Sequence, residues 1–257
     1  MHVGMCYRYV CKNVQPCYGD TPLHAAAEGG FINIVKLLLE RADIDPKKEN
    51  KYGNTPLHAA AEGGFINIVK LLLERADIDP NKENKSNKTL LHSAARGGNL
   101  DIVELLLERA DIDPNGENKD GSTPFDIAAE EERFKIVKLL LERTTIDLKK
   151  VYKDGNTVLH KATRSGELEL VQLLLKTSNI DPNQKNKYVG DTPLHLAVSG
   201  GNLDLVKLFL QRADIDPSKE NKYGDTPLHA AAEGGFINIV KLLLERADID
   251  PKKEKIS

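Results

Sequence analysis

The stretch TPLHAAAEGGFINIVKLLLERADIDP at residues 21–46 occurs unchanged twice more, at residues 55–80 and 226–251. Diverged copies begin at Thr89, Thr123, Thr157 and Thr192. We number the copies one to seven from the N-terminus; their starts lie 34 residues apart, except for one step of 35 that includes an extra residue around Val189. Similarity at a fixed period of this length is typical of stacked repeat units, each of which buries its apolar face against its neighbours.

Each copy predicts a helix, a turn, a second helix and an extended loop. In copy one, Thr21 can cap a helix with its hydroxyl group, and Pro22 suits the first helical position because that position needs no backbone donor. Gly29 and Gly30 predict the end of this helix, since Gly adopts a left-handed conformation at little cost. Apolar residues at helical spacing then predict a second helix over about residues 32–41.

The segment after the second helix is polar and contains Tyr52-Gly53, a pair typical of a hairpin turn. Copy two has Asn87 at the position of that Gly. Because Asn tolerates a positive φ better than other non-glycine residues, the exchange supports a turn at this point. We therefore expect a single repeat domain over residues 18–257, preceded by a short segment at 1–17 that is poorly ordered.

The pattern Thr-Pro-Leu-His-x-Ala-Ala, followed by Gly, Val, Leu-Leu and Ala-Asp-Ile-Asp, resembles the ankyrin repeat, and the resemblance covers residues 18–257. It implies an all-α solenoid of stacked helix-turn-helix units with hairpin-like loops. It also implies that the His of each copy bonds near the Thr cap and braces adjacent loops. The residues at these positions are Thr21, His24, Thr55, His58, Thr89, His92, Thr157, His160, Thr192, His195, Thr226 and His229. The chain departs from the family after the second helix, where the usual Gly is absent and Arg41 or its equivalent stands nearby.

Composition excludes several classes of protein. The chain has 257 residues, 36 Lys and Arg against 39 Asp and Glu, and a formal net charge of −3, so no strong positive field would attract nucleic acid. No apolar run approaches the roughly 20 residues of a membrane-spanning helix. The three cysteines lie within the first 17 residues, which favours a reducing, cytoplasmic location. The same features are compatible with an effector delivered into another cell.

No catalytic or metal site can be assembled from the sequence. Six of the seven histidines recur about 34 residues apart, which is too far for a shared metal ion. The DIDPNG sequence at 111–116 begins like a calcium-binding loop, but Ser122 stands where that loop needs a bidentate Glu. His2, Cys6, Cys11 and Cys17 match no paired zinc-binding spacing. We therefore expect no enzyme activity, no cofactor and no metal.

The resemblance implies that partners contact the hairpin tips and the exposed side of the first helices. Tyrosines at the tips favour interface use, because they offer a large contact area with few torsions to immobilise. Variation between copies concentrates in copies three to six, which indicates either a binding surface or older gene duplications. The candidate partner-binding residues are Tyr52, Ser86, Ser93, Arg96, Asp120, Ile127, Asp154, Lys161, Arg164, Tyr188, Leu196 and Tyr223.

Copy four differs most from the others. Asp126 replaces the His, which should remove a brace, and Glu131-Glu132 replaces Gly-Gly. Leu148 and Tyr152 stand where other copies have Pro and Asn. If the left-handed turn is kept, losing the Gly should cost on the order of 1 kcal/mol. Copy four is therefore either a binding site or the weakest joint of the array.

The leading hypothesis is a non-catalytic scaffold that binds a protein partner. The alternative is that the chain is a targeting or regulatory arm of a larger enzyme, effector or membrane protein. Nucleic-acid binding is a third hypothesis, which the charge opposes. Because copies one and seven share the block of the internal copy two, we also expect uncapped, apolar ends. The chain is then either part of a longer array or associates end to end.

Overall fold

The computed structural model describes residues 19–177 and 180–252, which form fourteen helices and no strand, as the all-α expectation requires. The chain divides after Thr145 into two compact units. The first contains α1 (Pro22–Glu28), α2 (Ile32–Leu39), α3 (Pro56–Gly63), α4 (Ile66–Leu73), α5 (Leu90–Gly97), α6 (Leu100–Leu107), α7 (Pro124–Glu130) and α8 (Phe134–Arg143). The second contains α9 (Val158–Arg164), α10 (Leu168–Leu175), α11 (Pro193–Ser199), α12 (Leu203–Leu210), α13 (Pro227–Glu233) and α14 (Ile237–Leu244). A single domain over 18–257 stays a prediction.

The first helix of each copy begins and ends as predicted. In copy one, the hydroxyl oxygen of Thr21 accepts a hydrogen bond from the His24 backbone N–H, and Pro22 is the first helical residue. The turn that follows has a left-handed residue, Gly30, with a φ of +75°. The second helix of copy one stops at Leu39, two residues before the predicted end. There the N–H of Arg41 bonds to the carbonyl of Leu38, which closes the last turn with an i→i−3 bond.

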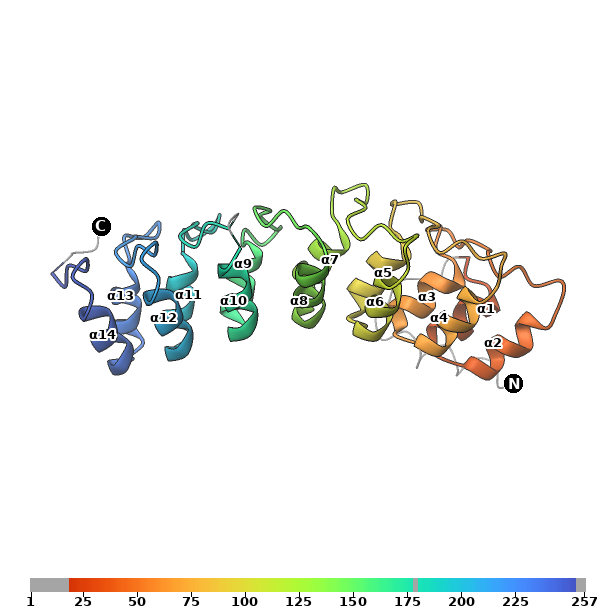
Figure 1. Ribbon diagram of the computed structural model, residues 1–257, viewed down its shortest axis with the longest axis horizontal. Helices are drawn as coiled ribbons and strands as arrows, with labels where there is room; N and C mark the ends of the chain where they lie inside the picture. Colours follow the sequence, from red (N-terminus) through yellow and green to blue (C-terminus); the bar gives the residue numbers. More distant parts are fainter. Residues whose placement is uncertain (1–18, 178–179, 253–257) are drawn as a thin grey trace, which may run out of the picture. The chain divides into compact units, whose positions relative to one another are not determined.

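In the first unit, successive first helices pack side by side, and so do successive second helices (Figure 1). The Val at one position of the second helices, including Val35 and Val69, is fully buried. Small residues allow the close approach of the first helices. A Cβ added to Gly97 would lie 2.1 Å from the carbonyl oxygen of Glu62 in the preceding copy, so this contact requires Gly.

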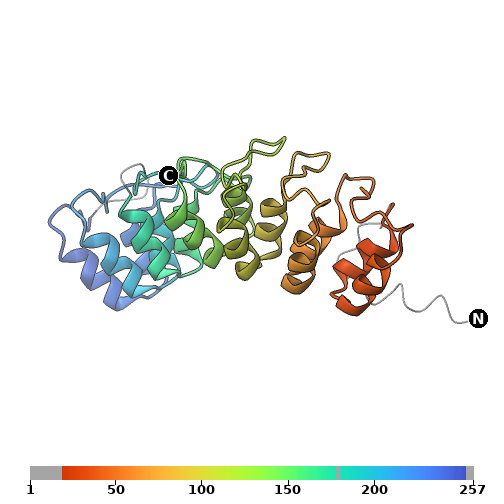
Figure 2. The same cartoon turned by 45° about the vertical axis from the view of Figure 1, so that its right-hand side comes forward.

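The second unit repeats this arrangement with three copies, and Figure 2 shows its helix pairs from a second direction. Its core contains Leu159, Val171 and Leu194, together with Phe209, which is fully buried in place of a Leu. Each copy thus contributes a thin apolar layer that is completed by its neighbour within the unit.

The hairpins of neighbouring copies are joined by backbone hydrogen bonds. The N–H of Lys85 donates to the carbonyl of Tyr52 at 2.9 Å in the first unit, and the N–H of Lys187 donates to that of Gly155 at 2.8 Å in the second. Asn87 has a φ of +56°, which confirms the left-handed turn expected from its exchange with Gly. These bonds hold the tips in a row within each unit.

Copy four keeps its local geometry despite its substitutions. The carboxylate of Asp126 accepts hydrogen bonds from the N–H and the hydroxyl of Thr123, at 2.9 and 3.0 Å. The hydrogen bonds at the cap are therefore retained, because the Asp126 carboxylate accepts where Nδ1 of the His does in other copies. The loss of a brace to the next loop stays a prediction. Glu132 occupies the left-handed position with a φ of +56°, as anticipated for a strained turn.

Candidate interaction surface

Four of the repeated histidines, His24, His92, His160 and His195, link the cap of one copy to the loop of the next. The N–H of Thr21 donates to Nδ1 of His24, so Nδ1 is an acceptor and the proton of the neutral ring lies on Nε2. That Nε2 donates to the carbonyl of Asn54 in the next loop at 2.9 Å. In the second unit, His160 reaches the carbonyl of Asp191 in the same way, at 3.1 Å. Both ring nitrogens are thus used in structural bonds.

Burial suppresses the protonation of four of the repeated histidines, His58, His92, His160 and His195. Burial lowers the pKa of His58 to about 4; its Nδ1 accepts at the Thr55 cap, and its Nε2 has no hydrogen-bond partner within the described residues. Burial likewise lowers the pKa of His160 to about 4. Burial is also the main cause that lowers the pKa values of His92 and His195. These four rings are therefore neutral at pH 7, and in His92, His160 and His195 the proton on Nε2 makes the bond to the next loop.

The tips of the hairpins present tyrosines to solvent. Tyr52 is 45% exposed, Tyr188 58% and Tyr223 65%. The hydroxyl group of Tyr188 donates to the carbonyl of Lys153 at 2.9 Å, which fixes its ring over the preceding hairpin. At the equivalent tips, Ser86, Asp120 and Asp154 are also exposed. The equivalent Tyr18 lies outside the described residues.

The candidate residues on the first helices fall into two groups. Arg164 is exposed, and Arg96 and Leu196 are partly exposed. The structure instead buries Ser93, Ile127 and Lys161, which are only 5–6% exposed, so they differ from the expected exposed side. The residue after the His lies on the flank of a first helix, where packing covers Ser93, Ile127 and Lys161, whereas the equivalent Leu196 stays partly exposed.

Lys161 belongs to a cluster that sequence reasoning missed. Its ammonium group lies 2.7 Å from a carboxylate oxygen of Asp154 and 5.7 Å from the centroid of the Tyr152 ring. Burial acts to raise the pKa of Asp154, but hydrogen bonds from Lys161 and Asn156 outweigh it, so the pKa is lowered. The signal was that Tyr152 and Lys161 both differ from the Asn and Ala at these positions in copies one and two.

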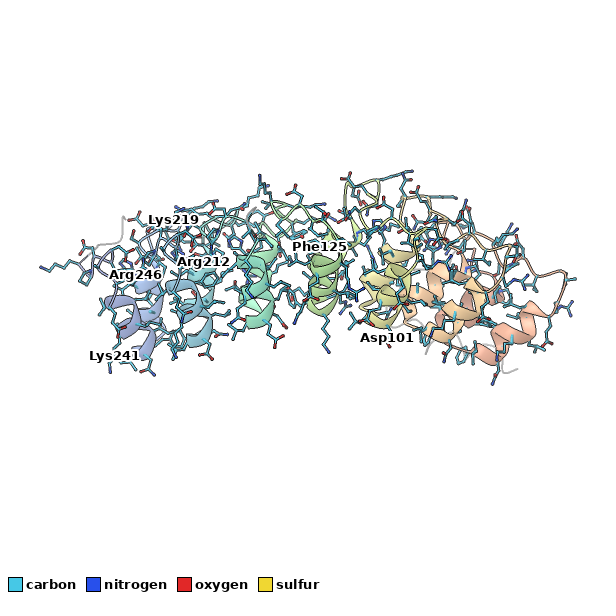
Figure 3. All side chains as sticks on the ribbon, in the orientation of Figure 1. Asp101, Phe125, Arg212, Lys219, Lys241 and Arg246 are labelled. Carbon is cyan, nitrogen blue, oxygen red and sulfur yellow. The ribbon has the colours of Figure 1, made fainter. Side chains whose placement is uncertain are left out.

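The Arg that follows the second helix in copies six and seven also has a role that the sequence did not reveal. Arg212 and Arg246, labelled in Figure 3, form ion pairs with the Asp two residues later, at 2.7 Å. Each also donates from Nη1 to the carbonyl of the last residue of the preceding second helix, Leu175 at 2.7 Å and Leu210 at 3.0 Å. In these copies, Arg therefore supplies a helix-ending contact where the family has Gly.

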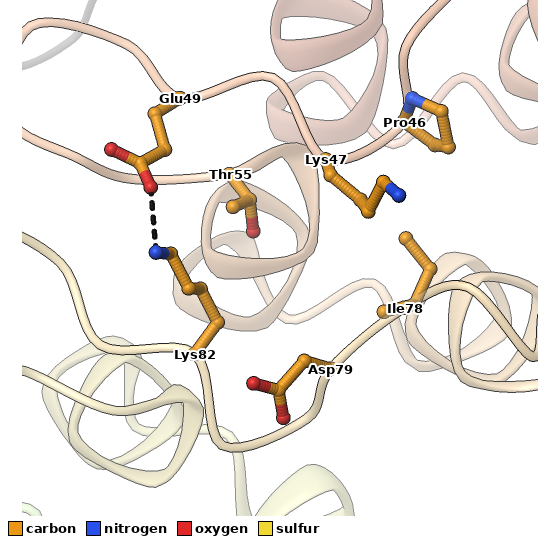
Figure 4. Close-up of a pocket in the computed structure, with 7 residues that line it drawn as sticks. All are labelled: Pro46, Lys47, Glu49, Thr55, Ile78, Asp79 and Lys82. Carbon is orange, nitrogen blue, oxygen red and sulfur yellow. Dashed lines mark ion pairs between the residues drawn. The ribbon is translucent and has the colours of Figure 1, made fainter.

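A depression between the loops of copies one and two has a volume of about 240 Å³ (Figure 4). Its lining includes Lys47, Asp79 and an ion pair between Glu49 and Lys82, whose N–O distance is 2.8 Å. The volume is below the range of typical small-molecule pockets, and four of the seven lining residues are charged. The depression therefore offers no basis for a substrate site.

The described part of the chain has neither a metal-binding cluster nor a membrane-spanning helix. No group of three or more His, Cys, Asp or Glu side chains there could hold a metal ion. His2, Cys6, Cys11 and Cys17 lie outside the described residues. Within residues 19–177 and 180–252, no helix has the length and apolar character needed to cross a membrane.

Comparisons with known proteins agree with this architecture. A sequence family described as "Ankyrin repeats (3 copies)" matches residues 3–84, 77–152, 114–186 and 159–254. A search of curated protein sequences found no match. The chain is similar to a solved structure titled "Crystal structure of the ankyrin repeat domain of Bcl-3: a unique member of the IkappaB protein family". The identity is 31% and the TM-score 0.60, over 87% of this chain and 99% of that one.

Ankyrin repeats are generally protein–protein interaction modules, and their fold is typically a non-catalytic scaffold. The matches extend over all seven copies, and the structure has the paired helices and the Thr–His caps that the resemblance implies. The chain belongs to the ankyrin-repeat family.

Proposed function

We propose that this chain is a non-catalytic scaffold that binds a protein partner through its hairpin tips and the exposed side of its first helices. The observation that carries the proposal is the exposure of tyrosines at one repeat position, from 45% at Tyr52 to 65% at Tyr223. Large, stiff side chains on a backbone held by inter-hairpin bonds lose little entropy on binding. The confinement of the cysteines to residues 1–17 supports an intracellular location.

The proposed surface is restricted to side chains that solvent can reach. In the first unit it comprises Tyr52, Ser86, Arg96 and Asp120, and in the second Asp154, Arg164, Tyr188, Leu196 and Tyr223. It mixes aromatic rings with both signs of charge, a composition typical of protein interfaces, in which Tyr and Arg dominate the binding energy. Ser93, Ile127 and Lys161 are left out because they are buried.

A quantitative capture experiment tests this surface. The chain is immobilised, and partners from a lysate are compared between wild type and the variants Tyr52→Ala and Tyr223→Ala. Glu104→Ala and Gln172→Ala serve as matched controls, since both residues are exposed on second helices. We expect each tyrosine variant to capture at most a tenth of the amount of a specific partner that wild type captures. The controls should capture the wild-type amount. Equal capture by all four variants would overturn the proposed surface.

A further inference from the structure

The interface between copies one and two joins two identical sequences. Residues 21–46 and 55–80 have the same 26-residue block, and their helices pack as α1 on α3 and α2 on α4. The copy-two side of this interface contains Ile68, which is 1% exposed, and Leu72, which is fully buried. The copy-one side contains Ala27 and Val35, both fully buried. The block therefore has two faces that fit each other.

Each of these faces is open once in the described structure. On copy one, Ile34 is the equivalent of Ile68 and is 49% exposed, and Leu37 beside it is 63% exposed. On copy seven, which has the same block, Ala232 is the equivalent of the buried Ala27 and is exposed. Ile237 on the same copy is 62% exposed. Because the sequences are identical, stacking alone accounts for these differences in exposure.

The fit of one particular pair shows how the faces engage. The Phe65 ring lies against Gly30 of the preceding copy, so that a Cβ added to Gly30 would meet the ring at 2.3 Å. Phe236 lies against Gly201 in the same way in the second unit. The equivalent residues at the two open faces are Phe31 of copy one and Gly235 of copy seven. Phe31 is 49% exposed, and a Cβ added to Gly235 would have open space around it.

We infer that copy seven of one molecule stacks on copy one of a second molecule and reproduces the interface between copies one and two. Phe31 of the second molecule would then lie on Gly235 of the first, and Ile34 would become buried as Ile68 is. The partner is thus a second copy of this chain. The two faces differ, so the contact is head to tail and does not close after two molecules; further molecules can add at either end.

Two variants that each block one face test the inference. Ile34→Glu places a charge on the copy-one face, and Ala232→Glu places one on the copy-seven face; both positions tolerate it in the single chain because they are already solvent-accessible. Asn33→Glu and Asn238→Glu are matched controls. Asn33, Asn67 and Asn238 are exposed in stacked and unstacked copies alike, so a charge there leaves the faces unchanged.

Light scattering after size exclusion, over a concentration series, gives the molar mass. We expect wild type and both Asn controls to exceed the 28.4 kDa of one chain increasingly with concentration. Each blocked variant alone should remain at the mass of one chain. Their mixture retains one intact face of each kind and should stop at twice that mass.

Two results would overturn the inference. One is a wild-type chain that stays at the mass of one molecule at every concentration. The other is a dimer formed by Ile34→Glu or Ala232→Glu alone, because it would show that a face pairs with itself or that another surface mediates association.

Discussion

The side-chain Nδ2 of Asn84 donates a hydrogen bond to Oδ1 of Asn54, 30 residues earlier, at 2.7 Å. The same link joins other neighbouring hairpins: Asn50 to Asp20 at 2.8 Å, Asn186 to Asn156 at 3.2 Å and Asn221 to Asp191 at 2.9 Å. In each case the acceptor is the residue before the capping Thr. The links add to the backbone bonds that hold the hairpin tips in a row.

Copy three interrupts this series. The residue before its capping Thr is Lys88, which offers no side-chain acceptor, and the buried Nδ2 of Asn118 has no hydrogen-bond partner within the described residues. We predict that Lys88→Asn supplies the missing acceptor and raises the free energy of unfolding by about 1 kcal/mol. Urea unfolding measures it, with Lys88→Ala as the control that removes Lys without adding an acceptor. Equal stability of the two variants would contradict the role of Asn118.

Glu132 provides a second stability test. It has a φ of +56°, whereas the neighbouring Glu131 has an ordinary φ of −87°. Glu132→Gly should stabilise the first unit by about 1 kcal/mol, since Gly adopts the left-handed conformation without steric cost. Glu131→Gly is the matched control and should destabilise slightly, because it only adds freedom to the unfolded chain. Thermal unfolding that ranks the two variants the other way would show that the turn is not strained.

A double-mutant cycle tests the ion pair between Lys161 and Asp154. We expect removal of Asp154 alone to cost more stability than replacement of both residues. Asp154→Ala leaves the charge of Lys161, whose side chain is 5% exposed, without its carboxylate partner. We expect a loss of about 2 kcal/mol, below the usual range for buried pairs because the Asp154 side chain is 41% exposed. Adding Lys161→Met should recover most of this loss, since an apolar chain of similar length fills the same space. Additive losses in the double variant would rule out coupling between the two residues.

The buried histidines predict an acid-sensitive fold. His58 and His160 have folded-state pKa values of about 4, below the ordinary value of 6.5, so the unfolded chain binds protons first as pH falls. Their contribution is complete above pH 6.5 and should be lost between pH 6.5 and 4, at about 2 kcal/mol for each ring by about pH 5. Denaturant unfolding at stepwise lower pH measures this loss. His58→Gln cannot gain that proton and should show a shallower decline; stability unchanged from pH 7 to 5 would refute the prediction.

The repeated block was sufficient to predict the helix pairs, their caps and the left-handed turns, including the one at Asn87. These features depend on residues within a few positions of each other. The sequence could not predict which side chains lie on the flank of a first helix, so Ser93, Ile127 and Lys161 were expected at the surface. Contacts that span about 30 residues, such as Asn84 with Asn54, depend on how one copy stacks on the next. Asp126 shows a further limit, because a carboxylate can replace an imidazole at a cap.

Site-specific photocross-linking tests the central claim, that a protein partner binds at the hairpin tips, most directly. A photoreactive phenylalanine analogue is placed at Tyr52, Tyr188 or Tyr223, and at Glu104 or Gln172 on the second helices as controls. We predict one discrete adduct with the same partner from the three tip positions and none from the controls. Absence of an adduct at every tip, or equal adducts from the second helices, would contradict the account.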